Sequence, residues 1–177
     1  MNTRIVLLRG VMPTGKNKVP MAELREALTK AGFARVRSWI QSGNLLVDTD
    51  LSRARTHDLV RQVLQSDLGV DLAVMVTSRA EIQAALEQNP FHSLAPDRVF
   101  YGFFNEAPEQ AKARALLSED FGEERLAITD GAVYMYIPGS AARSRLNNAF
   151  LQRRLGVDLT FRNRNTLMKL CEMAEKP

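Results

Sequence analysis

The residues best suited to chemistry near the start of the chain lie in the stretch LLRGVMPTGKNKVP, residues 7–20. Gly10, Gly15 and Lys16 have the spacing G-x-x-x-x-G-K of a phosphate-binding P-loop, and they follow an apolar run that predicts a strand. A P-loop has Ser or Thr after the lysine to hold magnesium, and its helix begins at the Gly-Lys pair. Asn17 takes the place of that hydroxyl, and Pro20 would break a helix that began at Gly15. The sequence therefore argues against a P-loop.

A weaker anion site remains compatible with the same loop. Lys16 and Lys18 supply positive charge, Asn17 supplies an amide, and glycine lets backbone N–H groups approach a ligand closely. A second interpretation stays open, in which the two glycines only turn the connection and the lysines are solvated. Such a site would combine this loop with the polar segment QSGN at 41–44, and RNRNT at 162–166 is a further candidate segment. Arg9 and Lys16 would supply charge, Asn17, Ser42 and Asn44 directional hydrogen bonds, and Gly15 close backbone approach.

The elements that must position these residues follow from an internal repeat. The pentapeptide LGVDL occurs at 68–72 and again at 155–159, and the patterns around it recur in the same order. Hydrophobic periodicity, turn residues and caps predict strand, helix, hairpin, helix, strand and helix in each half. In the second half, Ser140 and Asn165 are the predicted caps of the last two helices. The chain therefore divides into halves 1–90 and 91–177, which we expect to pack together as one compact unit.

Each half has the pattern β-α-β-β-α-β plus a helix, which predicts an α+β fold of two tandem ferredoxin-like units, or alpha-beta plaits. Right-handed crossovers and the hairpin favour the strand order 4-1-3-2. In that order the loop after strand 1 and the hairpin between strands 2 and 3 lie at one end of the sheet. We therefore expect Arg9, Lys16, Asn17 and Lys18 to lie near Gln41, Ser42 and Asn44.

Aligning the halves sets MVTSR at 75–79 against RNRNT at 162–166, so an apolar strand end in one half is densely polar in the other. Two explanations remain open, ligand binding by RNRNT and a polar contact between the halves.

Three separated motifs give the chain a resemblance to a known family. The motifs that carry the resemblance are, in order, LLRG followed by KVPMAELREAL, then GF-x-x-VRSWIQSGNLL, then F-RNRNT-L-x-KL. The chain resembles the bacterial domain of unknown function 1697 family over almost its whole length. The resemblance implies two ferredoxin-like halves and no established activity. The ligand-binding residues that its motif positions imply are Arg9, Gly10, Gly15, Lys16, Asn17, Gln41, Ser42, Asn44, Arg162, Asn163, Asn165 and Thr166. The sequence departs from the family pattern at Met12, where asparagine is typical, and at Arg164, where tryptophan is common.

Composition and charge narrow the function classes. The chain has 45% hydrophobic and 25% charged residues and no long apolar run, so we expect a cytoplasmic protein without a membrane partner. One cysteine, Cys171, and two histidines, His57 and His92, offer neither a metal site nor an evident catalytic base, so no metal and no cofactor are predicted.

The most favoured function is binding of a small anionic or phosphorylated ligand, or of a nucleic-acid backbone. A net charge of +4 does not by itself identify a nucleic-acid binder. The alternatives are an enzyme that acts on a phosphorylated ligand and a protein-interaction module that uses the acidic segment 106–124 and the basic segment 143–169. The oligomeric state and any catalysed reaction are left open by the sequence.

Overall fold

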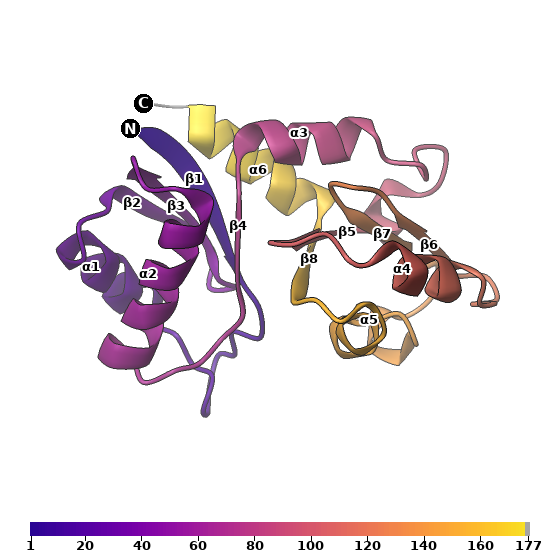
Figure 1. Cartoon of the computed structure of the whole chain (residues 1–177), viewed down its shortest axis with the longest axis horizontal. Coiled ribbons are helices and arrows are strands. Elements are labelled where there is room, and N and C mark those ends of the chain that lie inside the picture. The colour runs from indigo at the N-terminus through magenta and orange to yellow at the C-terminus, as the bar shows by residue number, and fades with distance from the viewer. Residues whose placement is uncertain (176–177) are drawn as a thin grey trace. The chain divides into compact units, whose positions relative to one another are not determined.

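The computed structural model describes residues 1–175 of the chain and has six helices and two four-stranded antiparallel sheets in those residues (Figure 1). The protein is a mixed α+β protein in two compact units. One unit contains Met1–Arg79 together with the chain from Lys169 onward, and the other contains Ala80–Met168. These limits differ from a division at residues 90 and 91, because the helix at 79–87 belongs to the second unit except for Arg79, and the last helix, 164–175, is divided between the units at Lys169.

The first unit is built on a sheet with the strand order β2-β3-β1-β4. Its strands are β1 (Asn2–Leu8), β2 (Ala34–Trp39), β3 (Asn44–Thr49) and β4 (Val74–Thr77). All neighbouring strands are antiparallel. The predicted order 4-1-3-2 is therefore confirmed, and it puts the end of β1 beside the β2–β3 hairpin.

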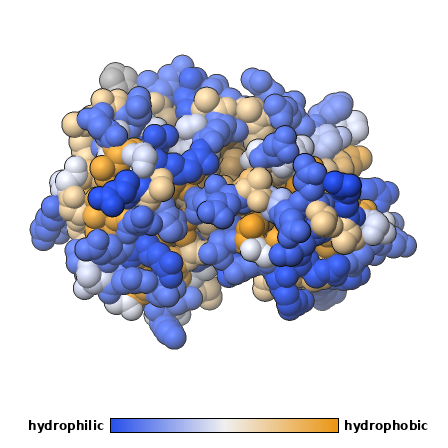
Figure 2. Space-filling model, viewed as in Figure 1, coloured by the Kyte–Doolittle hydropathy of each residue, from blue (hydrophilic) through white to orange (hydrophobic). Residues whose placement is uncertain are grey.

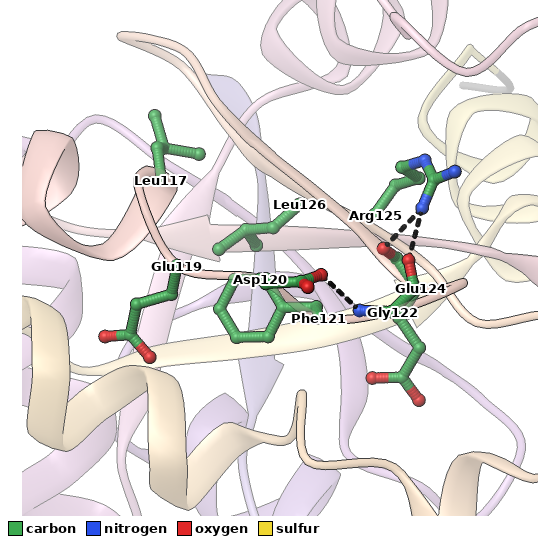
Figure 3. A pocket seen from close by; sticks show the side chains of 8 residues that line it. All are labelled: Leu117, Glu119, Asp120, Phe121, Gly122, Glu124, Arg125 and Leu126. Atoms are coloured by element: carbon green, nitrogen blue, oxygen red, sulfur yellow. Dashed lines mark hydrogen bonds between the residues drawn. The ribbon is translucent and has the colours of Figure 1, made fainter.

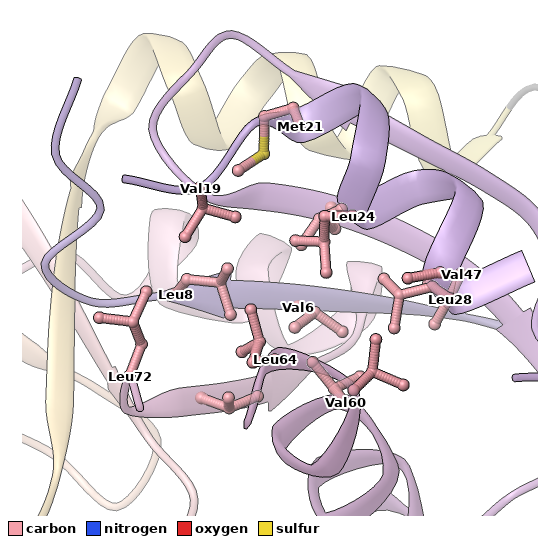
Figure 4. Packing of buried hydrophobic residues seen from close by; sticks show 14 of the residues in the cluster. Val6, Leu8, Val19, Met21, Leu24, Leu28, Val47, Val60, Leu64 and Leu72 are labelled. Atoms are coloured by element: carbon pink, nitrogen blue, oxygen red, sulfur yellow. The ribbon is translucent and has the colours of Figure 1, made fainter. Parts of the chain in front are cut away.

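One face of this sheet is covered by α1 (Met21–Lys30) and α2 (Arg53–Asp67). Side chains alternate along a strand, so Val6 and Leu8 of β1 point into the same apolar core as Leu24 of α1 and Leu64 of α2 (Figure 4). These four side chains are almost completely buried. Pro20 precedes α1, and Ser52 caps α2 by accepting a hydrogen bond from the Arg55 N–H.

The opposite face of the same sheet is buried and partly polar. Asp48 is 3% exposed and accepts a hydrogen bond of 2.7 Å from the Thr3 hydroxyl and another from Arg35. Burial alone would raise the pKa of Asp48, but these hydrogen bonds and the positive charge of Arg35 bring that pKa below its usual value. Asp48 is therefore a structural carboxylate that ties β3 to strands β1 and β2.

The end of the last helix, α6 (Arg164–Glu175), belongs to this first unit from Lys169 onward. Arg37 of β2 donates a 2.6 Å hydrogen bond to the Met173 carbonyl oxygen, and the Lys169 ammonium lies 5.2 Å from the centre of the Trp39 ring. The β2 strand is thus held by a helix that is distant from it in the sequence.

The second unit has a sheet of the same order, β6-β7-β5-β8. Its strands are β5 (Val99–Phe104), β6 (Arg125–Ile128), β7 (Val133–Tyr136) and β8 (Leu159–Asn163). The helices α4 (Gln110–Leu117) and α5 (Asn148–Leu155) contribute Leu116, Leu151 and Leu155 to its core. The predicted hairpin through Asp130-Gly131 is confirmed by the β6–β7 pairing.

The other face of this second sheet carries two buried tyrosines whose rings meet edge to face, Tyr101 and Tyr134, with centres 5.6 Å apart. The Tyr134 hydroxyl donates a 2.9 Å hydrogen bond to the carbonyl oxygen of Ala85 in α3 (Arg79–Glu87). Tyr101 accepts a 3.1 Å hydrogen bond from Asn89, just after α3. These contacts explain why α3 groups with the second sheet.

Two predicted helix caps are wrong. Ser140 precedes only a short 3₁₀ turn at Ala141–Arg143, and α5 is capped by Asn147, which accepts a 3.0 Å hydrogen bond from the Phe150 N–H. The start of α6 is capped by Asn163 rather than Asn165, because the Asn163 side chain accepts a 2.9 Å hydrogen bond from the Thr166 N–H. Several cap-forming residues lie close together at both places, and their local sequence does not distinguish them.

The surface of both units is mainly hydrophilic on the side drawn in Figure 2, with apolar residues scattered among charged ones. Within residues 1–175, no helix has the length and apolar character needed to cross a membrane.

Candidate functional site

The loop after β1 is held in a defined conformation by its own backbone. Gly10 and Gly15 have positive φ values of 82° and 81°, a region that glycine enters without steric cost. The Met12 N–H donates to the Asn17 carbonyl oxygen at 3.0 Å, and the Lys18 N–H donates to the Gly15 carbonyl oxygen at 3.1 Å. The helix α1 begins at Met21, well after Lys16. The loop therefore lacks the helix start of a P-loop, as the sequence predicts.

The loop and the β2–β3 hairpin meet at Gly43. The Leu8 N–H donates a 2.8 Å hydrogen bond to the Gly43 carbonyl oxygen. A methyl group added to Gly43 would lie 2.7 Å from the Leu8 Cβ and 2.8 Å from the Val11 Cγ2, closer than such carbons approach. Only glycine fits at this crossing. The start of the loop, at Leu8 and Val11, therefore meets the hairpin, while the closeness of Lys16, Asn17 and Lys18 to Gln41, Ser42 and Asn44 stays a prediction.

Asn44 closes the turn of the hairpin from inside. Its side chain is completely buried, and its amide donates to the Trp39 carbonyl oxygen at 3.3 Å and to the Ser42 hydroxyl at 2.8 Å. We expected Asn44 to offer hydrogen bonds to a ligand. The Asn44 amide is instead fully buried and spans the turn, so it positions the exposed residues Gln41 and Ser42.

The turn contains a strained residue that the sequence did not reveal. Ile40 has a φ of +50°, and its side chain is 55% exposed. A β-branched residue seldom adopts this left-handed conformation, which costs on the order of 1–2 kcal/mol. Met12 in the facing loop is similarly exposed, at 53%. The alternating pattern of residues 36–40 had indicated only that Ile40 belongs to a strand.

Positive charge gathers at the same end of the first sheet. The Arg9 N–H donates 3.0 Å to the Ala73 carbonyl oxygen, which fixes the start of the loop. The Nη1 atom of the Arg9 guanidinium is buried and has no hydrogen-bond partner among the described residues. Lys16 and Lys18 are exposed, and neither forms an ion pair with any residue from 1 to 175. The group therefore carries three cations and no neutralising carboxylate bound to them.

The RNRNT segment belongs to the second unit, at the end of β8 and the start of α6. Arg162 donates 2.8 Å hydrogen bonds to the Thr160 hydroxyl and to the Phe161 carbonyl oxygen, and burial lowers its pKa to about 10. Asn163 caps α6, Asn165 is exposed, and Thr166 is buried. Part of the polarity of this segment is therefore explained by a helix start.

A shallow hollow of about 200 Å³ lies between α4 and β6 in the second unit (Figure 3). Its apolar lining includes Phe121 and Leu126. Glu119 on its rim forms ion pairs with Arg154 and, at 2.5 Å, with Arg145. Both ion pairs lower the pKa of Glu119, and the ion pair with Arg154 has the larger effect. The sequence had indicated only two charged surfaces here, whereas the structure joins the acidic and the basic segment at this carboxylate.

No set of three or more His, Cys, Asp or Glu side chains within the described residues is arranged to hold a metal ion. Cys171 is buried, with its sulfur 4.0 Å from the Arg79 carbonyl oxygen, and burial raises its pKa. Such a thiol is a core residue and a poor nucleophile.

Comparison with known proteins places the chain in a family. No curated protein matches it. Among solved structures, the conserved bacterial protein SP0830 from Streptococcus pneumoniae is 26% identical and has a TM-score of 0.79, and the match covers 99% of each chain. Its description states no activity. The family model described as "Protein of unknown function (DUF1697)" matches residues 1–134, three quarters of the sequence. The chain therefore belongs to the DUF1697 family of proteins of unknown function.

Proposed function

We propose that this protein binds a small anionic or phosphorylated ligand at the end of its first sheet, between the 9–18 loop and the turn at 40–43. The observation that carries the proposal is the buried Nη1 atom of Arg9, which has no hydrogen-bond partner within residues 1–175. Leaving a buried donor unsatisfied costs roughly 1–3 kcal/mol, and more when the donor is charged. A bound oxyanion would satisfy it with a charge-assisted hydrogen bond.

The surrounding groups suit the same ligand. Lys16 lies on the exposed loop and has no competing carboxylate, so its ammonium is available to an anion. The positive φ of Gly15 leaves the peptide groups beside it open to close approach, since no atom lies within 4 Å of where its side chain would be. Asn17, Gln41 and Ser42 can add directional hydrogen bonds. Ferric, zinc or other metal chemistry is not needed for this kind of recognition.

A comparison of the two sheets supports the choice of a site in the first unit. The order β2-β3-β1-β4 and its repetition as β6-β7-β5-β8 support two ferredoxin-like units that arose by internal duplication. In the second unit, the segment after β5 contains NEAPEQ, which has no basic residue. The cationic loop is thus special to the first unit and is not required by the fold. Arg162, Asn163, Asn165 and Thr166 belong to the second unit and are not part of the site proposed here; ligand binding by this segment stays a prediction.

Ligand-induced thermal stabilisation tests the proposal. The purified protein is heated in the presence of inorganic phosphate, pyrophosphate, a nucleotide panel or short oligonucleotides. A ligand present at 100 times its Kd stabilises the folded state by about 2.7 kcal/mol, which is a clear shift in melting temperature. A response confined to oligonucleotides that falls steeply with salt would assign the site to a nucleic-acid backbone.

Two variants and one control sharpen the test. Arg9→Met removes the unsatisfied donor, so the free protein should melt at the same or a higher temperature while the ligand response is lost. Lys16→Ala should weaken the response without altering the free protein. Lys30→Ala, an exposed lysine at the end of α1, is the matched control and should leave the response intact. If no anion stabilises the protein, or if Arg9→Met keeps the full response, the proposal is wrong.

A further inference from the structure

The strained residue Ile40 is the least expected feature of the proposed site. Its φ of +50° is costly for a β-branched side chain, and its 55% exposure means that packing does not repay the cost. Glycine or asparagine would take the same backbone conformation more cheaply. Strained residues of this kind concentrate at ligand sites, where the surrounding structure holds them in place.

The structure that holds Ile40 is visible on both sides of it. Asn44 spans the turn from Trp39 to Ser42 by two hydrogen bonds, and Gly43 is bonded to the Leu8 N–H. The turn therefore cannot relax by moving its ends. Its conformation directs a large aliphatic side chain into solvent instead of into the core.

Met12 supplies a second exposed apolar group from the facing loop. Its N–H is bonded to the Asn17 carbonyl oxygen, and the neighbouring residue Val11 packs against Gly43. Met12 follows Val11 directly, and Ile40 precedes Gly43 by three residues, so both exposed apolar side chains belong to the two segments that meet at Gly43. The cations of Arg9 and Lys16 belong to the same loop as Met12.

We propose that the anion bound here is the phosphate of a nucleoside phosphate, and that Ile40 and Met12 contact the faces of its base. This inference rests on the proposed function. A base presents flat apolar faces that suit isolated aliphatic side chains, and polar edges that the exposed Gln41 amide can reach with hydrogen bonds. An acyl chain would need a continuous apolar surface, whereas Ile40 is followed directly by the exposed polar residues Gln41 and Ser42. The ligand is a free nucleotide or the 5′-phosphate end of a nucleic acid.

Calorimetric titration with four ligands tests the inference: adenosine 5′-monophosphate, ribose 5-phosphate, inorganic phosphate and adenosine. We expect the nucleotide to bind about tenfold more tightly than ribose 5-phosphate, the factor that 1.4 kcal/mol of base contact would give. A 5′-phosphorylated dinucleotide distinguishes the two sources, because only a nucleic-acid end site would favour it over the mononucleotide.

The variant Ile40→Gly makes the test specific. It removes the apolar contact and relieves the strain, so the melting temperature should stay the same or rise while the preference for the nucleotide over ribose 5-phosphate falls to about twofold or less. Ile40→Asn should behave in the same way, since asparagine tolerates this φ. Leu117→Ala removes another exposed apolar side chain, 42% exposed, in the second unit and is the control.

The possible failures are separable. If no phosphate compound binds, the proposed function is overturned and this inference with it. If ribose 5-phosphate binds as tightly as the nucleotide, or if Ile40→Gly leaves the preference unchanged, this inference alone is overturned.

Discussion

Replacing Gly43 by alanine tests the geometry on which the candidate site depends. The new methyl group would lie 2.7 Å from the Leu8 Cβ and 2.8 Å from the Val11 Cγ2, and the backbone would have to keep a φ of +77°. The left-handed conformation costs about 1–2 kcal/mol for a residue with a side chain. Overpacking against two side chains costs about 1–3 kcal/mol more. We therefore expect the free energy of unfolding to fall by about 2–5 kcal/mol.

Gly15→Ala is the matched control. Gly15 has nearly the same φ, +81°, but no atom lies within 4 Å of where its methyl group would be. Only the conformational cost of about 1–2 kcal/mol applies there. The difference between the two variants, about 1–3 kcal/mol, isolates the close approach of loop and hairpin. Urea unfolding measures both, with the fluorescence of Trp39, the only tryptophan in the sequence, as the probe at the end of β2.

A double variant checks the source of the cost. Val11→Ala removes one of the two clashing carbons, so the pair Val11→Ala and Gly43→Ala should lose less stability than the sum of the single changes. If Gly43→Ala costs no more than Gly15→Ala, the loop and the hairpin do not meet as described, and the site built from them is wrong.

Three further changes probe other parts of the structure. Gly102→Ala would put a methyl group 2.6 Å from the ring of Phe161, so it should cost about 1–3 kcal/mol in urea unfolding, and the added change Phe161→Leu should restore part of the loss. The pKa of Asp48 is lower in the folded state than its ordinary value of 3.8. The ionised carboxylate therefore contributes fully to the free energy of unfolding above about pH 4, and this contribution is lost as the pH falls through the folded-state pKa. Asp48→Asn should therefore flatten the dependence of unfolding free energy on pH below about 4, and an unchanged slope would refute this role. Asn163→Ala should cost about 1 kcal/mol through loss of the α6 cap and Asn165→Ala much less, and the reverse order in thermal melts would contradict the capping assignment.

The strand order was predictable because few topologies satisfy a hairpin, right-handed crossovers and a repeated pattern together. The same reasoning predicted that the 9–18 loop meets the hairpin, since topology alone decides which loops share an end of a sheet. Hydrophobic periodicity also predicted the order of strands and helices in each half, which the structure shows. These features depend on local patterns and on general rules of chain connection.

The remaining features depend on tertiary contacts that no local pattern contains. An amphipathic helix shows that it has a buried face but not which sheet covers that face, so the assignment of α3 to the second unit was not foreseen. The strain at Ile40 arises because Asn44 and Gly43 fix the ends of the turn, and those bonds exist only once the strands have paired. Sequence reasoning therefore predicted polar residues of the proposed site but did not point to the exposed apolar side chains of Ile40 and Met12.

The division of α6 between the units has a consequence for how the chain is made. During synthesis the first sheet emerges early, but the turns of α6 that bond Arg37 and contact Trp39 emerge only after the whole second sheet. Until then the nascent first sheet lacks these contacts to β2, the outer strand that leads into the 40–43 turn. We expect fragments that stop before Lys169 to fold poorly, and no single crossover point in the gene could exchange one unit between relatives intact.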